Sequence, residues 1–552
     1  HPGQRRDGRA VSTAADDLVV PVLIVGAGPT GVSAATMLAQ RGIDSLLIDR
    51  YAAVYPLPRA VHLDDEVHRI LQGMGVADAF AGISEPRQGL VIVDNRLRIM
   101  ARFDRTRTVG DHGWPQANFF DQPEFEEALR ANLRRFPGTR IQGRRELVRF
   151  EQDVTGGKAP VRAVVRDLDS GEETVVWAKA LLACDGANST VRDLIGSTLI
   201  DLKFEERWLV IDVTSPQPLD VLDVAYQVSD STRPATFMKV LPGRYRWEFR
   251  LNEGETVDDL CAPGRFSELI RPWTQDVPID DLTIMRTAEY TFRARIADRW
   301  QDRRTFLLGD AAHLTPPFIG QGLCAALRDA SNLCWKLAAV LDGGAPESLL
   351  STYQEERFAP AKNLVRKAVM LGTAMSGGPG YASFLRRAVL AALCRVPGIS
   401  DKVLDTPSPP LAISPLVKRD KKHPLPGTLA PQPWLVVDGV RRRADDVLGS
   451  GFSVVTVVAP DPQTQELAKR LQAPIVLIAS SALPAGVVPD VDAIAVDEDA
   501  VLLTWLRAAG ASTVILRPDR VVLLQSTNDD RHLGVDDLDP MVGTPPLATP
   551  VP

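Results

Sequence analysis

The length, composition and charge of the chain restrict the kinds of protein it can be. It has 552 residues, of which 45% are hydrophobic and 24% are charged, as in soluble globular proteins, and a chain this long is expected to form about three domains. The net charge of −7 disfavours nucleic acid as the main partner, because binding to phosphates requires a basic surface. No run of about eighteen apolar residues is present, so no transmembrane helix is expected.

The two ends and the cysteines add little. Residues 1–19 begin with a polar, basic segment and are predicted to be a disordered or added extension. The five cysteines are odd in number, scattered and free of C-x-x-C spacing, so neither a disulfide framework nor a metal site is indicated. They are Cys184, Cys261, Cys324, Cys334 and Cys394. Reduced thiols in a cytoplasmic protein are the expectation.

The first informative stretch, Leu23 to Arg50, has the pattern of a dinucleotide-binding unit. An apolar run ends at a complete G-x-G-x-x-G formed by Gly26, Gly28 and Gly31. The first glycine suits the turn, the second a close approach of the backbone to a pyrophosphate, and the third close packing of the following helix on its strand. That helix would point its N-terminus at the diphosphate. The alternative is a structural glycine-rich turn.

An acid at the expected distance favours the dinucleotide interpretation. Asp49 follows a second apolar strand and lies eighteen positions after Gly31, close to the roughly twenty expected for the carboxylate that binds a ribose hydroxyl. Arg59 lies in the next connection, where it could return over a bound nucleotide or be a solvated loop charge. Gln122 opens a helix predicted to run to about Arg135, where it could act only as a cap.

Two more apolar strands end in an acid. One ends at Asp185-Gly186, before a helix that Ser189 caps. The other ends at Gly309-Asp310, and a helix beginning at Gly320-Gln321-Gly322 follows it. Acids at the carboxyl ends of buried strands lie where open α/β sheets bind ligands, and Asp310 suits a polyol hydroxyl.

Together these three stretches resemble the single-component flavoprotein aromatic hydroxylases, the family of p-hydroxybenzoate hydroxylase. The family signatures are a G-x-G-x-x-G with its acid, an internal D-G motif, and a G-D motif followed by P-x-x-G-x-G. Within the family, the chain is most similar to the 3-(3-hydroxyphenyl)propionate hydroxylase branch. That similarity rests on Pro58-Arg59-Ala60, Arg207–Asp212, Arg246–Phe249 and Gly309–Leu337.

The resemblance implies FAD as the bound cofactor. The start of the helix after Gly320 would face the pyrimidine edge of the flavin, where about half a positive charge favours the anionic reduced ring. The residues implied in cofactor binding come from all three stretches and the segments between them. They are Gly26, Gly28, Pro29, Thr30, Gly31, Asp49, Arg50, Arg59, Gln122, Asp185, Gly186, Gly309, Asp310, Pro317, Gly320, Gln321, Gly322 and Leu323.

The family also implies a reaction. NADH or NADPH would bind transiently, which agrees with the absence of a second glycine fingerprint from the sequence. Hydride would pass to FAD, O2 would add to give a flavin C4a-hydroperoxide, and one oxygen would be transferred to a phenolic ring next to its hydroxyl. A base would help, because a phenolate is more electron-rich than a phenol. His62 is the first candidate, and the predicted catalytic set is His62, Tyr226 and Pro317.

Residues 201–294 are predicted to form a β-sheet that covers the substrate pocket, because several segments there alternate apolar and polar residues. An aromatic residue on such a strand more often belongs to the core than contacts a ligand. The predicted substrate contacts are Tyr226, Phe237, Met238, Phe249, Tyr290, Pro317 and Phe318.

The predicted fold is α/β with α+β elements. A Rossmann-like FAD-binding domain spans 20–200 and 295–400, the last part as a helical extension, and the substrate domain lies between them. A proline-rich linker (401–433), a thioredoxin-like domain (434–526) and a tail (527–552) follow. Because no cysteine follows Cys394, thiol chemistry is excluded there, and a role in structure or association, including a homodimer, is expected.

Three functions remain open from the sequence. The first is a phenol hydroxylase. The second is a polyketide-tailoring oxygenase that hydroxylates, epoxidises or performs Baeyer–Villiger insertion on a polycyclic substrate. The third is a flavin-binding protein without oxygenase activity.

Overall fold

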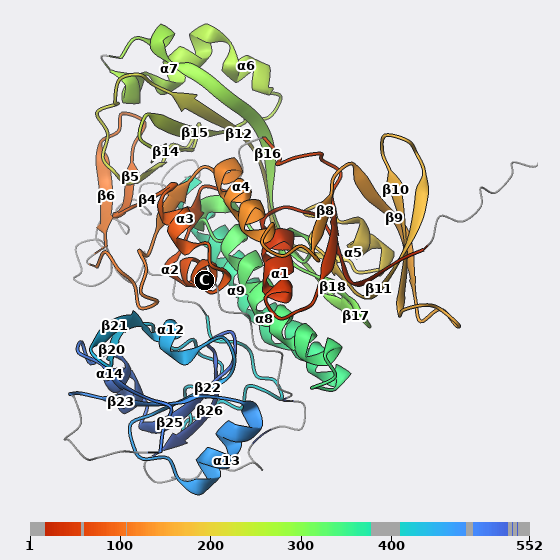
Figure 1. The fold of residues 1–552 in the computed structure, drawn as a ribbon. Helices are drawn as coiled ribbons and strands as arrows, with labels where there is room; N and C mark the ends of the chain where they lie inside the picture. The colour runs from red at the N-terminus through yellow and green to blue at the C-terminus, as the bar shows by residue number, and fades with distance from the viewer. Residues whose placement is uncertain are drawn as a thin grey trace, which may run out of the picture.

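The computed structural model describes residues 17–56, 60–105, 107–275, 277–376, 409–481 and 490–527, together with Leu533, Leu538 and Val542. Arg59, most of both predicted terminal extensions and the predicted helical segment beyond residue 376 lie outside this described part. The described chain forms a mixed α/β structure with three large sheets and a fourth of three strands (Figure 1). This confirms the predicted fold class.

The first sheet brings the predicted cofactor motifs to one edge. Its strand order is β17-β18-β11-β1-β2-β8, with parallel pairing from β18 through β8. The register aligns Val25 with both Ile48 and Ala183, and Ala183 with Leu307, so four strands end together. The strands of this sheet are β1 (Leu18–Val25), β2 (Ser45–Ile48), β8 (Arg140–Gln142), β9 (Arg145–Gln152), β10 (Val161–Asp167), β11 (Glu173–Ala183), β17 (Gln301–Asp302) and β18 (Thr305–Leu307).

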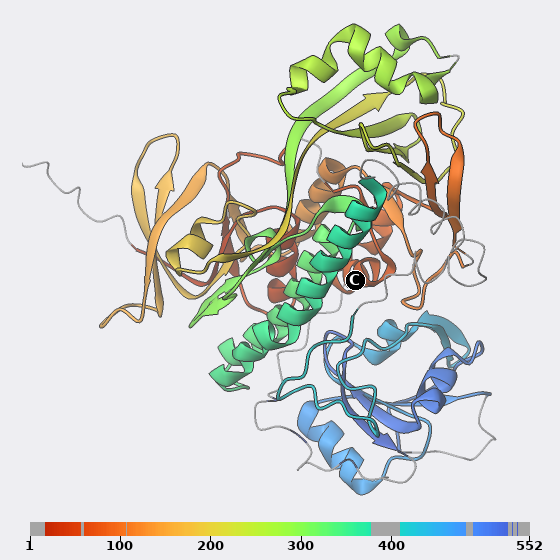
Figure 2. The ribbon, with the colours of Figure 1, turned by 180° about the vertical axis from the view of Figure 1, so that it is seen from behind.

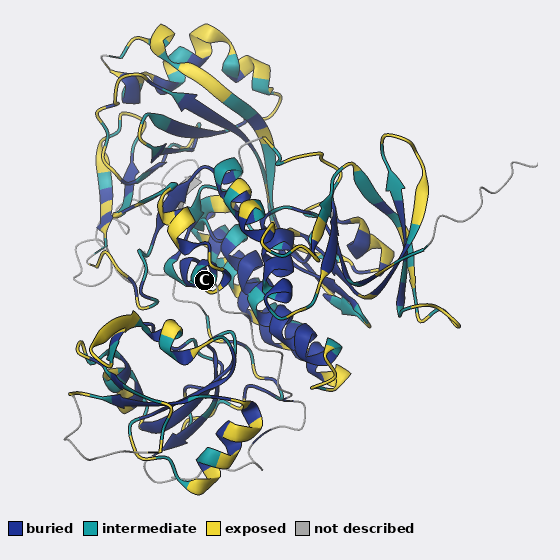
Figure 3. Cartoon of the chain, in the orientation of Figure 1, coloured by how far each residue is buried: buried dark blue, intermediate teal, exposed yellow. Residues whose placement is uncertain are grey.

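Helices bury the first sheet. The α1 helix packs against α4 and α8, and α1 and α8 are buried along most of their lengths (Figure 3). Seen from behind, α8 and α9 run beside each other below the second sheet (Figure 2). The helices are α1 (Pro29–Ala39), α2 (Asp65–Met74), α3 (Ala77–Ala81), α4 (Gln122–Leu133), α5 (Thr190–Leu194), α8 (Gly322–Leu341) and α9 (Thr352–Ser376), with short 3-10 turns η2 (Gly309–Ala311), η3 (Pro317–Ile319) and η4 (Glu347–Ser351).

The second sheet has the order β19-β16-β12-β15-β14-β13-β5-β6. One of its faces packs on α6 and α7, which lie on the side away from α8 (Figure 1). Two of its strands, β5 and β6, come from the segment predicted to belong to the FAD-binding domain. The elements are β5 (Gly89–Val93), β6 (Ile99–Asp104), β12 (Leu199–Thr214), β13 (Ala225–Val228), β14 (Ala235–Leu241), β15 (Arg244–Arg250), α6 (Val257–Cys261), α7 (Pro263–Thr274), η1 (Ile279–Asp281), β16 (Thr283–Ala297) and β19 (His313–Leu314).

A small sheet joins the two large ones. Its strands β3 (His62–Leu63), β4 (Ser84–Pro86) and β7 (Asn118–Phe120) are ordered β3-β7-β4. Phe119 on β7 packs with Met238 and Val240 of the second sheet. His62 therefore lies near the seam between the first and second sheets.

The C-terminal sheet has the order β21-β20-β24-β23-β22-β25-β26. Within it β22 and β23 are parallel, whereas β25 and β26 are antiparallel to their neighbours, which agrees with the expected thioredoxin-like arrangement. The elements are β20 (Trp434–Val437), β21 (Val440–Arg443), α12 (Ala444–Leu448), β22 (Ser453–Thr456), α13 (Pro462–Leu471), β23 (Ile475–Ala479), β24 (Ala493–Val496), α14 (Val501–Ala508), β25 (Ala511–Leu516) and β26 (Val522–Thr527).

Buried ion pairs attach this C-terminal unit to the rest of the chain. Arg517 contacts both carboxylate oxygens of Glu356 on α9 at 3.0 and 3.1 Å, and all of these atoms belong to fully buried side chains. Lys336 on α8 donates to the same carboxylate at 2.7 Å. Although burial alone would raise the pKa of Glu356, the two cations lower it to about 2. The charged carboxylate is therefore part of the packing between α8, α9 and the C-terminal unit.

No helix in the described ranges combines the length and the apolar character needed to cross a membrane.

Candidate functional site

The glycine turn after β1 has the geometry that each glycine was predicted to provide. Gly26 has a φ of +104°, and a Cβ there would lie 2.2 Å from the carbonyl oxygen of Cys184. A Cβ on Gly31 would lie 2.0 Å from the carbonyl oxygen of Gly26, so only glycine allows α1 to approach the turn this closely. A Cβ on Gly28 would instead meet nothing within 4 Å. The turn thus packs against the protein on two sides and faces open space on the third.

The three motif stretches meet at this turn. Cys184, which precedes Asp185, donates its N–H to the carbonyl of Val25 at 2.8 Å. Gly309, which precedes Asp310, has a φ of +60°, and a Cβ on it would lie 3.2 Å from the hydroxyl oxygen of Thr30. The D-G and G-D motifs therefore flank the G-x-G-x-x-G. Gly186 is in the left-handed region at a φ of +79° and a Cβ there would also face open space.

The acid after β2 is held against the same turn. Asp49 accepts the N–H of Ala27 at 2.7 Å and that of Tyr51 at 2.8 Å. Its carboxylate is half-buried at the strand edge, as the dinucleotide interpretation requires. The side chain of the neighbouring Arg50 is 75% exposed and lies 3.9 Å from Glu146.

Asp185 has a carboxylate oxygen that no described residue satisfies. Its Oδ2 accepts the N–H of Val191 at 3.1 Å, whereas Oδ1 is buried without a hydrogen-bond partner in the described structure. Burial raises the pKa of this carboxyl group. Buried polar atoms are nearly always paired, so the unpaired oxygen fits a hydroxyl group supplied by a cofactor. Asp310 lies exposed in η2 at the end of β18, where a polyol chain could reach it.

A buried carboxylate below the G-D motif fixes its shape. Asp329 on α8 accepts the N–H of Gly309 at 3.1 Å, the Nε2–H of His313 at 2.7 Å and the Nε–H of Arg357 at 2.9 Å. Burial would raise the pKa of Asp329, but His313 and Arg357 lower it. His313 is thus a structural partner of Asp329. The role of Asp329 was not predicted, since only its place in a buried helix was visible.

The start of α8 lies beside His62. Gly320 has a φ of +61°, and its carbonyl oxygen is 3.2 Å from Nδ1 of His62. Burial lowers the pKa of His62, so the imidazole is neutral and Nδ1–H donates to this carbonyl. The first residues of α8, Gly322 and Leu323, follow with main-chain N–H groups at the N-terminus of a helix of 20 residues.

The side chain of Gln321 is engaged within the protein and does not extend the row of main-chain N–H groups at the start of α8. Its Nε2 donates to Asp64 at 3.0 Å and its Oε1 accepts from Arg328 at 2.9 Å. Arg328 also donates to Asp64 at 2.6 Å. Burial would raise the pKa of Asp64, but Arg328 and the N–H of Val67 lower it to about 2. Only the main chain of Gln321 is therefore available to a cofactor.

Gln122 is likewise engaged within the protein. Its Oε1 accepts the N–H of Ala60 at 2.7 Å, and its Nε2 donates to Glu126 at 2.6 Å. Gln122 therefore holds the end of the connection that contains Arg59, which itself lies outside the described residues. On the same helix, Arg130 donates to the carbonyl of Ala27 at 2.9 Å. The sequence analysis missed Arg130, although it lies two turns after Gln122 on one helix face.

The predicted substrate contacts fall on both faces of the second sheet. Tyr226, Phe237 and Phe249 belong to the core between this sheet and α7, and the hydroxyl of Tyr226 accepts the N–H of Leu222 at 2.8 Å. These three side chains therefore do not line the space between the two sheets. Met238 packs with Phe119 in a different cluster, on the face toward the cofactor motifs.

The remaining predicted contacts also lie toward the cofactor motifs. Tyr290 is opposite Trp208 on the neighbouring strand. Pro317 is exposed in η3. The ring of Phe318 lies 5.8 Å from that of Trp208, so η3 bridges the start of α8 and the second sheet.

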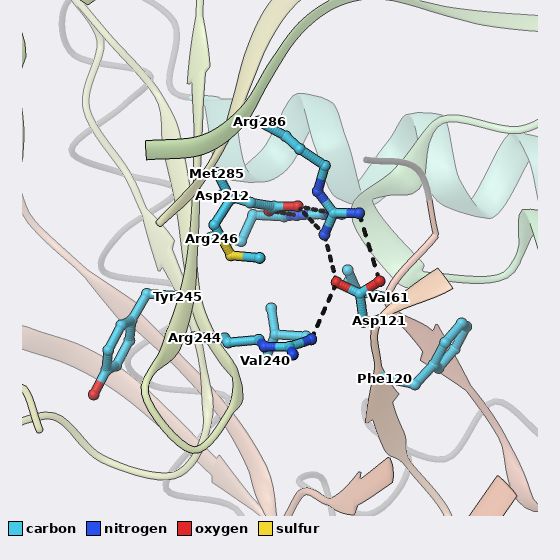
Figure 4. A pocket seen from close by; sticks show the side chains of 10 residues that line it. All are labelled: Val61, Phe120, Asp121, Asp212, Val240, Arg244, Tyr245, Arg246, Met285 and Arg286. Carbon is cyan, nitrogen blue, oxygen red and sulfur yellow. Dashed lines mark hydrogen bonds and ion pairs between the residues drawn. The ribbon is translucent and has the colours of Figure 1, made fainter. Parts of the chain in front are cut away.

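A polar pocket lies on the seam between the sheets (Figure 4). Asp121, just after β7, lies between Arg244 and Arg286, and Arg286 also contacts Asp212 at 2.9 Å. The cavity volume is about 10 Å³, which is enough for about one water molecule and far below the roughly 300 Å³ of small-molecule sites. The ion pairs around this pocket therefore connect the segment after β7 to the second sheet, and the pocket is too small for an aromatic ring.

The site residues fit FAD better than a metal. The open space at the glycine turn suits a phosphate, and the unpaired oxygen of Asp185 suits a hydroxyl group. The N-terminus of α8 suits an electron-rich ring. Within the ranges that the structure describes, no three metal-ligating side chains converge.

Comparison with known proteins agrees with FAD as the cofactor. Residues 19–368 match the family described as FAD binding domain, and residues 427–539 match the HcaD C-terminal domain. A 3-(3-hydroxy-phenyl)propionate/3-hydroxycinnamic acid hydroxylase of Burkholderia vietnamiensis is 34% identical, with 92% of this chain and 93% of the relative covered. A probable NADH-specific resorcinol 4-hydroxylase of Rhodococcus jostii is 31% identical, with 91% of each covered.

Solved structures show the same fold. The flavin-dependent monooxygenase PieE, in complex with FAD and substrate, has a TM-score of 0.74 at 22% identity over 94% of this chain and 96% of its own. Aklavinone-11 hydroxylase, in complex with FAD and aklavinone, has a TM-score of 0.73 at 23% identity over 94% and 97%. With the FAD-binding family match over more than half of its length and relatives above 30% identity over nearly all of it, the chain belongs to the family of FAD-dependent aromatic hydroxylases.

Proposed function

We propose that this flavoprotein hydroxylates a small phenolic compound, using NADH or NADPH and O2, at a position next to an existing hydroxyl. The observation that carries the proposal is the meeting of three strand ends and one helix N-terminus around the open side of Gly28. FAD bound there would accept hydride from the nicotinamide and activate O2. The rest of the chemistry depends on how this chain orients the ring and moves a proton.

The chain offers each part of FAD a different group. The N–H groups at the start of α1 suit the diphosphate, and Asp49 suits the adenosine ribose. Asp310 and the unpaired Oδ1 of Asp185 suit hydroxyl groups of the ribityl chain. The N-terminus of α8, beside His62, suits the pyrimidine edge of the ring because it favours negative charge there.

The aromatic substrate is proposed to lie between this helix end and the second sheet. Phe318 and Trp208 bound that space on one side, and Met238 with Phe119 bounds it on the other. Apolar walls of this kind exclude water from the reacting ring. This location replaces Tyr226, Phe237 and Phe249, which lie on the opposite face, as the substrate-contacting set.

The relatives favour a small phenol over a polycyclic substrate. Those that are 31–34% identical over more than 90% of the chain bear names of hydroxylases of 3-hydroxyphenylpropionate and resorcinol. The structural neighbour named for the polycyclic aklavinone is only 23% identical. At that level the likeness carries the fold and not the substrate.

Oxygenated product and NADH or NADPH consumption across simple phenols and polycyclic quinols test the proposal. Substrate-stimulated consumption with a hydroxylated phenol as the product supports it. Preference for the quinols would favour a polyketide-tailoring oxygenase. Tight FAD binding with no stimulation by any aromatic compound would indicate a flavin-binding protein without oxygenase activity.

A further inference from the structure

Glu248 occupies the centre of the second sheet on the face toward the cofactor motifs. In the antiparallel ladder it lies opposite Val210 on β12 and Thr236 on β14, and Val210 lies opposite Ala288 on β16. Directly opposed residues on antiparallel strands share a face. Along this row the smaller Val210 and Thr236 flank Glu248, and the next residue, Gln227 on β13, accepts the hydroxyl of Thr236 at 3.0 Å.

The rows on either side locate this part of the sheet. In one row, Met238 lies opposite Arg246, and Met238 packs with Phe119, whose ring is 6.0 Å from that of His62. In the other row, Trp208 contacts Phe318, which belongs to η3 just before Gly320. Glu248 lies between these rows, so it is on the side of the sheet toward His62 and Phe318.

The charges around Glu248 leave it without a partner. Arg246 is engaged by Asp212, with Nε–Oδ1 at 2.6 Å and Nη2–Oδ2 at 2.9 Å. Glu248 is only 9% exposed, and its carboxylate makes no hydrogen bond or ion pair with another residue of the described ranges. A buried polar group of this kind is rarely left unsatisfied in the working state of a protein.

The other titratable and charged groups on this side of the sheet come from four strands. Glu206 and Asp212 lie on β12, Arg286 and Tyr290 on β16, and His62 on β3, whereas Arg244, Arg246 and Arg250 alternate with Glu248 on β15. Arg244 is paired with Glu124, and Arg250 lies 3.7 Å from Glu206. On β14, the same face presents only Thr236 and Met238 near Glu248. Burial raises the pKa of Glu248 to about 7, with Arg246 lowering it and Asp212 raising it further.

We propose that Glu248 is the catalytic base that accepts the proton of the substrate's phenolic hydroxyl. The O–H bond of the phenol breaks, its electron pair stays on the phenolic oxygen, and the proton becomes bonded to a carboxylate oxygen of Glu248. No electron is exchanged with the protein in this step. The inference rests on the proposed phenol hydroxylation and names the group that serves it.

This assignment differs from the sequence-based choice of His62. The Nδ1–H of His62 donates to the carbonyl of Gly320, and burial makes the imidazole harder to protonate. A base is most effective when its pKa is near the working pH, which Glu248 satisfies better. His62 then positions the start of α8 beside the ring.

The decisive experiment compares Glu248→Gln with Glu289→Gln. Glu289 lies on β16 of the same sheet, is exposed, and pairs with Arg207 at 2.7 Å, so its variant controls for loss of a carboxylate from the sheet. Both variants should bind FAD with the wild-type absorption spectrum. With an ordinary phenol, Glu248→Gln should lower kcat/KM by about 100-fold and remove the acidic limb of its pH profile near neutrality. Glu289→Gln should leave both unchanged.

A phenol that is already ionised separates a proton acceptor from a merely structural residue. With a fluorinated phenol ionised at the assay pH, Glu248→Gln should lose less than about tenfold in kcat/KM. An equal loss for ionised and un-ionised phenols, or an unchanged acidic limb, would overturn the assignment. If Glu248→Gln does not take up FAD, Glu248→Asp supplies the test: it should keep the limb at a reduced kcat, and a missing limb refutes the role. Wild-type enzyme that hydroxylates no phenol at all would instead refute the proposed function.

Discussion

Gly28 tests where the cofactor binds. It has a φ of −75°, which alanine adopts readily, and a Cβ there would meet no protein atom within 4 Å. The free energy of unfolding of the Gly28→Ala apoprotein should therefore lie within about 1 kcal/mol of the wild-type value. If the diphosphate lies against this backbone, the added methyl displaces it and removes at least one hydrogen bond to a charged group, worth about 1.5–3 kcal/mol. The Kd for FAD should then rise roughly 10- to 150-fold.

The assay has two parts and a matched control. Quenching of flavin fluorescence on titration of the apoprotein gives the Kd, and urea denaturation of the apoprotein gives the free energy of unfolding. In the control, Gly31→Ala, the new Cβ would lie 2.0 Å from the carbonyl oxygen of Gly26, so the apoprotein should lose about 1–3 kcal/mol. The reasoning is refuted if Gly28→Ala binds FAD as tightly as wild type, or if it destabilises the apoprotein as much as the control.

Asp185→Asn should weaken FAD binding and slightly stabilise the apoprotein, because a buried, unpaired oxygen costs less free energy in a neutral amide than in a carboxylate. FAD titration and urea denaturation measure the two effects. An unchanged Kd for FAD would contradict the cofactor role. Arg517→Met should lower the free energy of unfolding by about 3–5 kcal/mol, since it leaves the buried Glu356 without its main cation; a urea curve matching wild type speaks against this. The folded-state pKa of Glu356, about 2, lies below its ordinary value of 4.5, so its contribution is complete above about pH 4.5 and is lost as the pH falls toward 2. Glu356→Gln should flatten the pH dependence of unfolding in that window, and an unchanged slope would contradict the assignment.

The convergence of the cofactor motifs could be predicted because each motif ends a buried strand. Parallel neighbours bring their carboxyl ends to one edge, so Gly26, Asp185 and Gly309 met as expected. The partners that hold these motifs could not be predicted in the same way. Asp329 reaches Gly309 from twenty positions away, and Arg328 reaches Asp64 from 264 positions away. No local pattern identifies such pairs.

The sequence predicted the second sheet but not which of its two faces would turn toward the cofactor motifs. Phe237 and Met238 are neighbours on β14, so their side chains point to opposite faces. Both are apolar because α7 buries one face and the cofactor part buries the other. When both faces are buried, alternation gives no indication of which one lines a pocket. Arg59 belongs to residues 57–59, which lie outside the described structure, so its predicted contact with FAD stays a prediction.

The pairing of β5 with β13 means that the second sheet is not built from one continuous piece of sequence. Strands β5 and β6 enter it from residues 89–104, more than ninety positions before the strands of 199–297 that they join. A chimera that transplants only 199–297 from a relative would combine three strands of the recipient (β5, β6 and β19) with five of the donor across non-native seams. Recombination that aims to exchange ring selectivity should therefore move both segments together, with the β5–β13 ladder kept from a single parent.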